Sequence, residues 1–185
     1  MYEEIDAQHY ESLCDNVASS VVMYPDILSL LQTVSEHSNI TAVVVTSGLK
    51  RVWQKVLGLE RLPIKVIGGD RLSYSFVVTP EVKSALVKRL QDVHKQYVWA
   101  FGDSPLDLGM LKQADRAVVV VGNMDTRSKS MESHIFTAID EGLKAHQVRL
   151  PSTVPPRVDT VRLPELSRFS NSWSISVGSV LQFVS

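Results

Sequence analysis

Short apolar runs alternate with longer amphipathic stretches along most of the chain. The runs at 41–46 and 97–101 are rich in β-branched, small or aromatic residues, a pattern typical of strands buried on both faces of a sheet. Between them, Val82, Leu86 and Leu90 have the spacing of an amphipathic helix. This alternation predicts a three-layer, Rossmann-like α/β fold, with helices on both faces of a parallel sheet. We expect helices over residues 2–20, 26–37, 49–57, 80–95, 105–113 and 130–144, strands over 41–46, 64–67, 97–101 and 117–121, and a short strand or hairpin over 72–78.

The regular alternation ends after residue 143. Residues 150–157 contain three prolines and predict an extended linker, because proline-rich segments favour an extended, unpaired backbone. The remainder of the chain is rich in serine, and apolar residues return over 174–184. This C-terminal region therefore predicts a linker and tail.

Composition narrows the class of protein. A length of 185 residues allows one core of ordinary size, and a formal net charge of −1 gives no electrostatic attraction for nucleic acid or an anionic membrane. No apolar run approaches the length of a membrane span. Cys14 is the single cysteine, which excludes an intrachain disulfide and fits a reducing compartment. We expect a cytoplasmic domain without a nucleic-acid or membrane partner.

The segment 102–107, Gly-Asp-Ser-Pro-Leu-Asp, follows one of the buried strands. A strand that ends in glycine before two carboxylates predicts an oxygen-ligand site for a hard cation such as Mg²⁺ at the carboxyl edge of the sheet. Asp103 and Asp107 are therefore candidate metal ligands. The alternative is local: Asp103 or Ser104 caps the next helix, and Asp107 lies in its first turn, where the helix dipole favours negative charge.

Two further segments carry groups suited to phosphate. The first buried strand leads into Ser47 and Gly48, which offer a hydroxyl and a backbone N–H at the mouth of the sheet. Thr79 and Pro80 are typical of a helix start, and they place Lys83 near the N-terminal end of that helix. Each segment also has an ordinary alternative: a serine-capped turn in the first case and a solvated surface lysine in the second.

Taken in order, the three segments resemble the haloacid dehalogenase superfamily of phosphohydrolases, in its phosphoserine-phosphatase-like branch. Ser47 with Gly48 matches the second motif of that family, and Lys83 matches the third. Asp103 and Asp107 match the fourth. The resemblance implies that Ser47, Gly48 and Lys83 bind the phosphate group, Ser47 and Lys83 as catalytic residues. It implies that Asp103 and Asp107 hold Mg²⁺.

The first motif of that family has no counterpart in this chain. It is Asp-x-Asp on the first strand, and its leading aspartate is the covalent nucleophile. Asp6, Asp15 and Asp26 precede the first buried strand, and none of them follows an apolar, strand-like run. The resemblance, which covers roughly residues 20–143, therefore implies a domain that begins within the cap insertion and is inactive or very weak as a hydrolase.

The resemblance also implies a division into a helical cap remnant over 1–22, a core domain over 23–148 and the linker and tail over 149–185. The strand of the missing motif is central in that family. Its loss would leave unpaired backbone groups inside the sheet, which is costly. We hypothesise that residues 174–184 supply a replacement strand. The alternatives are direct pairing of the two flanking strands, a strand from another chain, or a flexible tail.

Three functions stay open on the sequence. The chain is a phosphomonoesterase domain for a phosphorylated small molecule, a non-catalytic module that binds phosphate or a phosphorylated metabolite, or an interaction protein whose sheet is completed by a second copy or a partner chain. The substrate cannot be read from these motifs. Arg127 and Lys129 follow the last predicted strand. We expect them in a solvated loop, with contact to a substrate anion as the alternative.

Overall fold

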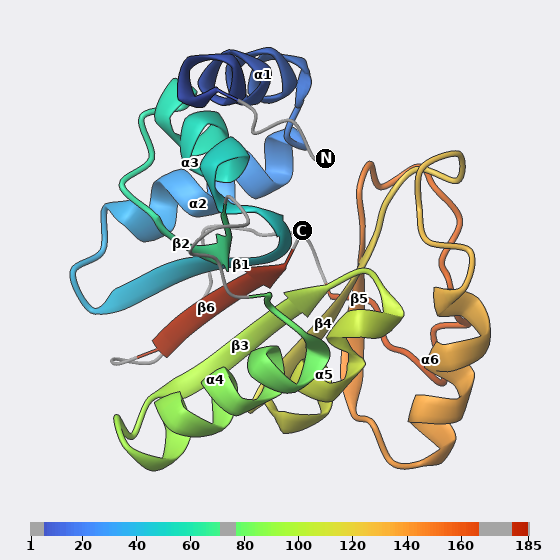
Figure 1. The fold of residues 1–185 in the computed structure, drawn as a ribbon. Helices are drawn as coiled ribbons and strands as arrows, with labels where there is room; N and C mark the ends of the chain where they lie inside the picture. The colour runs from blue at the N-terminus through green and yellow to red at the C-terminus, as the bar shows by residue number, and fades with distance from the viewer. Residues whose placement is uncertain (1–5, 71–76, 167–178, 185) are drawn as a thin grey trace, which may run out of the picture.

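The computed structural model describes residues 6–70 and 77–166, and the backbone of 179–184 (Figure 1). Within these residues six strands form one parallel sheet in the order β2-β1-β6-β3-β4-β5, which confirms the predicted α/β fold. The helices are α1 (Ala7–Ser20), α2 (Pro25–Ser35), α3 (Lys50–Leu59), α4 (Pro80–Asp92), α5 (Leu108–Gln113) and α6 (Met131–Asp140), with the short 3₁₀ helix η1 (Pro105–Asp107). The strands are β1 (Ile40–Leu49), β2 (Lys65–Gly69), β3 (Tyr97–Gly102), β4 (Arg116–Val121), β5 (Ala145–Arg149) and β6 (Ser179–Val184).

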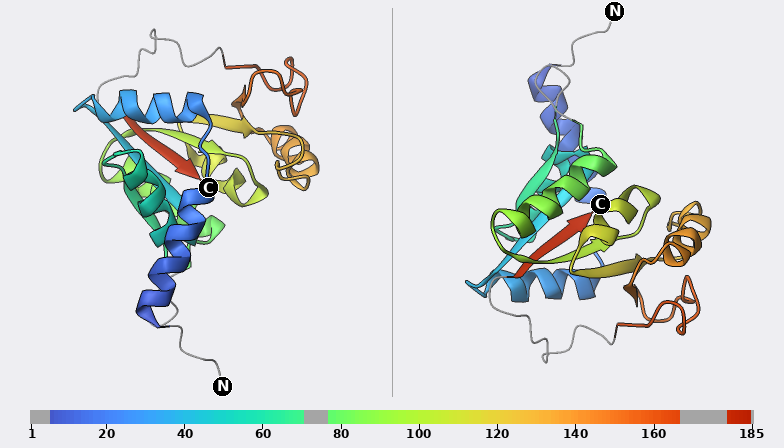
Figure 2. Two further views of the ribbon diagram at one scale, coloured as in Figure 1. Left: turned by 90° about the horizontal axis from the view of Figure 1, so that it is seen from above. Right: turned by 90° about the horizontal axis from the view of Figure 1, so that it is seen from below.

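Helices cover both faces of the sheet (Figure 2). Strand β3 shows why its sequence is apolar at successive positions: Val98 and Ala100 belong to one core cluster, and Phe101 belongs to the other. Val87 of α4 lies in the first cluster, together with residues of α5 and α6. Leu31 of α2 lies in the second. A strand buried on both faces therefore separates two helical layers, as its composition predicts.

Helix α1 lies outside these layers and packs on α3 (Figure 1). Cys14 of α1 is buried in this contact beside Val52 of α3, and the guanidinium of Arg51 binds the Glu11 carboxylate through two nitrogens. The assignment of residues 1–22 to a cap remnant stays a prediction. In the described chain no single helix is long and apolar enough to cross a membrane. Only α1 and α2 taken together, with a bend of 109° between them, reach that length and composition.

Strand β6 fills the centre of the sheet, between β1 and β3 and parallel to both. Val180 aligns with Thr41 on one side and with Val98 on the other. The hypothesis of a replacement strand is thus confirmed for residues 179–184, and direct pairing of β1 with β3 is wrong. The other residues of the proposed segment, and most of the strand or hairpin expected over 72–78, lie outside the described residues. Assembly with a second chain stays a prediction.

The sequence predicts a helix as far as residue 144, whereas α6 ends at Asp140. Gly142 adopts φ +99°, a left-handed conformation that glycine takes without strain. The backbone N–H of Leu143 returns to the carbonyl of Ala138 at 2.8 Å and closes the helix. The chain is then free to enter β5, a strand that the sequence pattern did not indicate.

Residues 150–157 were expected to form an extended linker, but they and residues 158–166 pack on the core instead. Gln147 of β5, itself fully buried, holds this segment through its side-chain amide. Its Nε2 donates to the carbonyls of Val158 at 2.6 Å and Leu163 at 2.8 Å, and its Oε1 accepts from the backbone N–H of Arg157 at 3.0 Å. The segment also buries the apolar side chains of Leu150, Val154, Val158 and Leu163.

Substitution of Leu181 by proline tests the position of β6. Proline removes one backbone N–H from a strand that is paired on both sides and leaves its acceptor unpaired, so we expect a loss of unfolding free energy of about 1–3 kcal/mol. The measurement is the urea unfolding midpoint. Leu181→Val keeps the N–H and is the matched control, with a much smaller expected loss. If Leu181→Pro unfolds at the wild-type midpoint, β6 does not lie within the sheet.

Substitution of Gln147 by leucine tests the attachment of residues 150–166. The variant removes the partners of two buried carbonyls and two buried N–H groups, and we expect it to lower the unfolding free energy by roughly 2–4 kcal/mol. Gln54→Leu, at an exposed position of α3, provides the control with the same change of side chain and little expected effect. Equal unfolding midpoints for the two variants would contradict this role for Gln147.

Candidate functional site

Hydrogen bonds join the three motif segments at the carboxyl ends of β1 and β3. The Ser47 hydroxyl, at the end of β1, donates to the carbonyl of Val78 at 2.9 Å. Val78 immediately precedes Thr79, whose Oγ1 caps α4 by accepting from the N–H of Val82. Lys83, in the first turns of α4, then donates from Nζ to Asp107 Oδ1 at 2.9 Å. The Ser47 contact joins residues 31 positions apart in the sequence, and the Lys83 contact joins residues 24 positions apart.

Lys83 and Asp107 form an ion pair inside the protein. Their side chains are 2% and 0% exposed. The second oxygen of Asp107, Oδ2, accepts from the backbone N–H groups of Asp103 at 3.1 Å and Ser104 at 3.0 Å, and from the Ser104 hydroxyl at 2.9 Å. Ser104 and Asp107 thereby make a reciprocal cap at the start of η1. A Cβ on Gly102 would lie 2.5 Å from that of Asp107, so this loop requires glycine.

Asp103 is the carboxylate of this loop that is left without such partners. It is half-buried, and no other described residue donates a hydrogen bond to its side chain. Burial raises the pKa of Asp103, and the Asp107 charge raises it further. The positive charges of Arg157 and Lys83 act in the opposite direction and are smaller influences on this pKa. The Asp103 carboxylate can therefore accept a hydrogen bond or bind a cation from outside the described chain.

The end of β1 differs from the turn that the sequence suggests. The strand continues to Leu49, with a break in register between Val45 and Leu49. The Gly48 N–H, a predicted phosphate donor, already donates to Thr46 Oγ1 at 2.9 Å. Ser47 and Gly48 are both exposed. A phosphate group at this edge must therefore compete with these local hydrogen bonds.

The two candidate metal ligands have different capacities. Both oxygens of Asp107 are engaged, so it is suited to hold the loop rather than to bind a cation directly. Asp103 offers open carboxylate oxygens. The described residues contain no cluster of three or more histidine, cysteine or acidic side chains that would form an all-protein metal cage. This donor set suits Mg²⁺, which is commonly held by one or two carboxylates together with water and phosphate oxygens.

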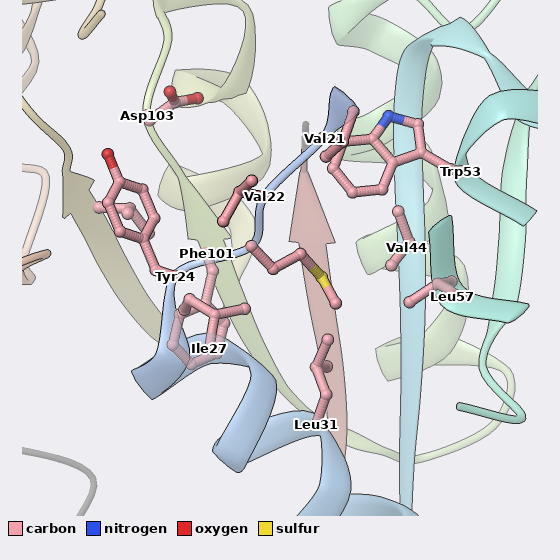
Figure 3. A pocket seen from close by; sticks show the side chains of 12 residues that line it. Val21, Val22, Tyr24, Ile27, Leu31, Val44, Trp53, Leu57, Phe101 and Asp103 are labelled. Atoms are coloured by element: carbon pink, nitrogen blue, oxygen red, sulfur yellow. The ribbon is translucent and has the colours of Figure 1, made fainter. Parts of the chain in front are cut away.

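An apolar cavity of about 290 Å³ adjoins the site (Figure 3). Residues of β1, β3, β4, α2, α3 and the α1–α2 connection line it. Asp103 is the charged member of this described lining. Figure 3 shows Asp103 and the Tyr24 hydroxyl at one end, and Leu31 at the other. The cavity can accommodate an apolar group whose polar end reaches Asp103.

Sequence reasoning missed Arg157, because it falls in the segment predicted to be a linker. Arg157 is 6% exposed, and the pKa of its guanidinium is lowered by burial and by the nearby Arg127 charge. Its charge also acts on Asp103. The expected solvated loop is wrong for Arg127, whose side chain is 9% exposed and pairs with Glu132 at 2.9 Å. Lys129 is exposed, as expected.

The comparison with known families covers the same region. A family model described as haloacid dehalogenase-like hydrolase matches residues 1–112. Neither the comparison with curated proteins nor that with solved structures found a match. The matched span is more than half of the 185 residues and contains all three motif segments. The chain therefore belongs to the haloacid dehalogenase-like hydrolase family.

Proposed function

We propose that this chain binds a phosphate group, free or in a phosphomonoester, at the edge formed by Ser47, Lys83 and Asp103, and hydrolyses it very weakly or not at all. The observation that carries the proposal is the direct linkage of the three motif segments, from Ser47 to Val78 and from Lys83 to Asp107. On the order of its motifs, the chain resembles the phosphoserine-phosphatase-like branch of the family. The proposed role is that of a phosphohydrolase domain, or of a non-catalytic phosphate-binding module built on the same fold.

The phosphate contacts follow from the donors at this edge. Ser47 and Gly48 are exposed at the end of β1, and each can exchange its local acceptor for a phosphate oxygen. A phosphate oxygen is a stronger acceptor than a neutral carbonyl or hydroxyl, so the exchange is favourable for a bound anion. The Lys83 ammonium has three N–H donors, of which Asp107 Oδ1 takes one. Its positive charge supports an anion at the site.

Haloacid dehalogenase-like hydrolases typically use Mg²⁺, and the residues present fit that ion in part. Asp103 would hold it through its open carboxylate, and Asp107 would fix the loop from which Asp103 projects. When bound, Mg²⁺ would neutralise phosphate charge. Because the metal requires ionised Asp103, the raised pKa of that carboxyl makes protons compete with the metal.

The proposed weakness in hydrolysis follows from the absence of an attacking group. In the family that the chain resembles, phosphoryl transfer depends on an aspartate nucleophile in the first motif. The sequence of this chain has no counterpart of that motif. Ser47 is a poor substitute, because its hydroxyl proton is directed to the Val78 carbonyl rather than to a base. The residues at the edge can orient and neutralise a phosphate without attacking it.

The adjoining cavity bears on the substrate. Among the described residues, its lining is apolar apart from Asp103 and the polar tips of Tyr24 and Trp53. A charged amino-acid leaving group would lose hydration there without matching partners. The cavity therefore favours a phosphomonoester with an apolar body over phosphoserine itself.

A phosphate-binding assay paired with a phosphatase assay tests the proposed function. We expect calorimetry to detect inorganic phosphate binding in the presence of Mg²⁺, while phenyl phosphate is not turned over above background. Ser47→Ala should weaken phosphate binding roughly tenfold, because it removes one hydrogen bond to a charged group. Ser19→Ala, on the exposed face of α1, is the control and should bind normally. Rapid Mg²⁺-dependent turnover, or unchanged binding by Ser47→Ala, would contradict the proposal.

The Asp103→Asn substitution should raise the Tm and remove the effect of Mg²⁺ on phosphate binding. The raised pKa of Asp103 means that folding disfavours its ionised form, so Asp103→Asn should unfold at a higher temperature than wild type at neutral pH. The penalty is full above the folded-state pKa and disappears as the pH falls from there to the ordinary aspartate value. The difference in Tm should therefore close in acid, and Mg²⁺ should no longer strengthen phosphate binding.

Asp125→Asn, in the exposed loop after β4, is the matched control for both measurements and should leave them unchanged. A lower Tm for Asp103→Asn at neutral pH would show that the carboxylate stabilises the folded protein, contrary to this account.

A further inference from the structure

Arg157 carries a buried guanidinium with an unused edge. The residue is 6% exposed. Its Nη1 donates to the carbonyl of Ser128 at 2.7 Å, and its backbone N–H is fixed by Gln147. Its Nε and Nη2 are sealed from solvent and have no hydrogen-bond acceptor in the described part of the chain. Two donor nitrogens of a charged group are therefore left unsatisfied inside the protein.

Such an arrangement is costly unless an acceptor arrives. Buried polar groups in native proteins are almost always hydrogen-bonded, and a buried charge carries a still larger desolvation penalty. Burial and the neighbouring Arg127 charge already lower the pKa of Arg157. The nearby acidic groups, Asp103 and Glu132, oppose this shift through their charge, but neither accepts a hydrogen bond from the unused edge. An oxyanion would satisfy both donors at once.

The identity of the two free nitrogens specifies the shape of that partner. Nε–H and one N–H of Nη2 lie parallel along one side of a guanidinium and match two oxygens of a single carboxylate or phosphate. The same protein shows this pairing elsewhere. Arg51 uses Nε and Nη2 to bind the Glu11 carboxylate, at 2.8 Å from Nε to Oε1 and 2.8 Å from Nη2 to Oε2. Arg157 presents the equivalent edge without a bound carboxylate.

The position of Arg157 connects this edge with the candidate site. Its charge and that of Asp103 influence each other's pKa. Ser128, which accepts its third donor, lies in the loop that follows β4, beside β3 in the sheet. The backbone N–H of Arg157 is held by Gln147 of β5, and the guanidinium is held by the Ser128 carbonyl in this loop. It is therefore fixed in place at the carboxyl end of the sheet.

We propose that Arg157 binds two oxygens of a phosphate group through Nε and Nη2, as an anion-binding residue additional to the three motif segments. The choice of phosphate over carboxylate rests on the proposed function. The shared chemistry is the phosphate oxyanion, from free inorganic phosphate or from a phosphomonoester. Because both nitrogens are sealed, the residues that cover them must move to admit the anion.

The test measures how far phosphate raises the Tm of the full chain, for each variant against its own ligand-free Tm. A ligand that binds the folded state raises Tm, and this comparison cancels any direct effect of the substitution on folding. Inorganic phosphate and phenyl phosphate are titrated separately, and calorimetry gives the affinities. Arg157→Gln should weaken phosphate binding at least tenfold and abolish the rise in Tm. Arg157→Lys keeps the charge but not the paired donors, and should lose most of the affinity as well.

Arg162→Gln is the matched control. It lies in the same segment, but its guanidinium is already paired with Asp140 and stacked 5.1 Å from the Phe136 ring centroid, so phosphate binding should be unchanged. Weakened binding of inorganic phosphate alone would assign the site to free phosphate, and weakened binding of both probes would assign it to the phosphate end of a monoester.

The proposal for Arg157 is overturned if Arg157→Gln binds both probes as wild type does, or if wild type binds neither. The Ser47→Ala variant separates it from the proposed function. Loss of binding in Ser47→Ala with normal binding in Arg157→Gln retains the motif site and removes Arg157 from it. The reverse result retains the arginine site and removes the motif site.

Discussion

The buried ion pair between Lys83 and Asp107 is the interaction on which the rest of the site depends. Both side chains are removed from water, and their nitrogen and oxygen lie 2.9 Å apart. Loss of either partner would leave an unpaired buried charge, a change that typically costs about 3–5 kcal/mol. The pair joins α4 to the loop after β3, so the geometry of that loop depends on a helix that begins at Pro80, well before it in the chain. The position of Asp107 also requires glycine at 102, since any Cβ there would collide with the Asp107 side chain.

This pair also separates the roles of the two aspartates. Asp107 satisfies Lys83, the backbone of Asp103 and both donors of Ser104, and is therefore a structural centre of the loop. Asp103 receives no comparable support and bears the cost of burial next to a like charge. Because burial and the Asp107 charge disfavour its ionised form, the Asp103 carboxylate would be stabilised by a cation or another positive partner. Asp103 and Arg157 thus each carry a charge that is partly buried without enough hydrogen-bond partners, the first negative and the second positive.

The elements with strong local patterns were predictable, and those fixed by distant contacts were not. Apolar runs identified β1, β3 and β4, and the sequence Thr79-Pro80 identified the start of α4. In contrast, β5 has a mixed sequence without an apolar run, and it becomes a strand by pairing with β4. The prolines of residues 150–157 indicated a linker, because nothing local reveals that the side chain of Gln147 holds this segment by four hydrogen bonds.

The candidate site shows the same division. Motif order located Ser47, Lys83, Asp103 and Asp107, since each follows a recognisable strand or begins a helix. Their hydrogen-bond partners depend on tertiary packing, so neither the occupied N–H of Gly48 nor the saturated state of Asp107 was visible in the sequence. Arg157 had no local signal at all.

Strand β6 separates backbone pairing from the chemistry of its side chains. It restores the backbone pairing of β1 and β3, which any sequence of suitable conformation can do. Its residues, Ser-Val-Leu-Gln-Phe-Val, include no carboxylate. Completion of a parallel sheet therefore does not require a carboxylate in its central strand.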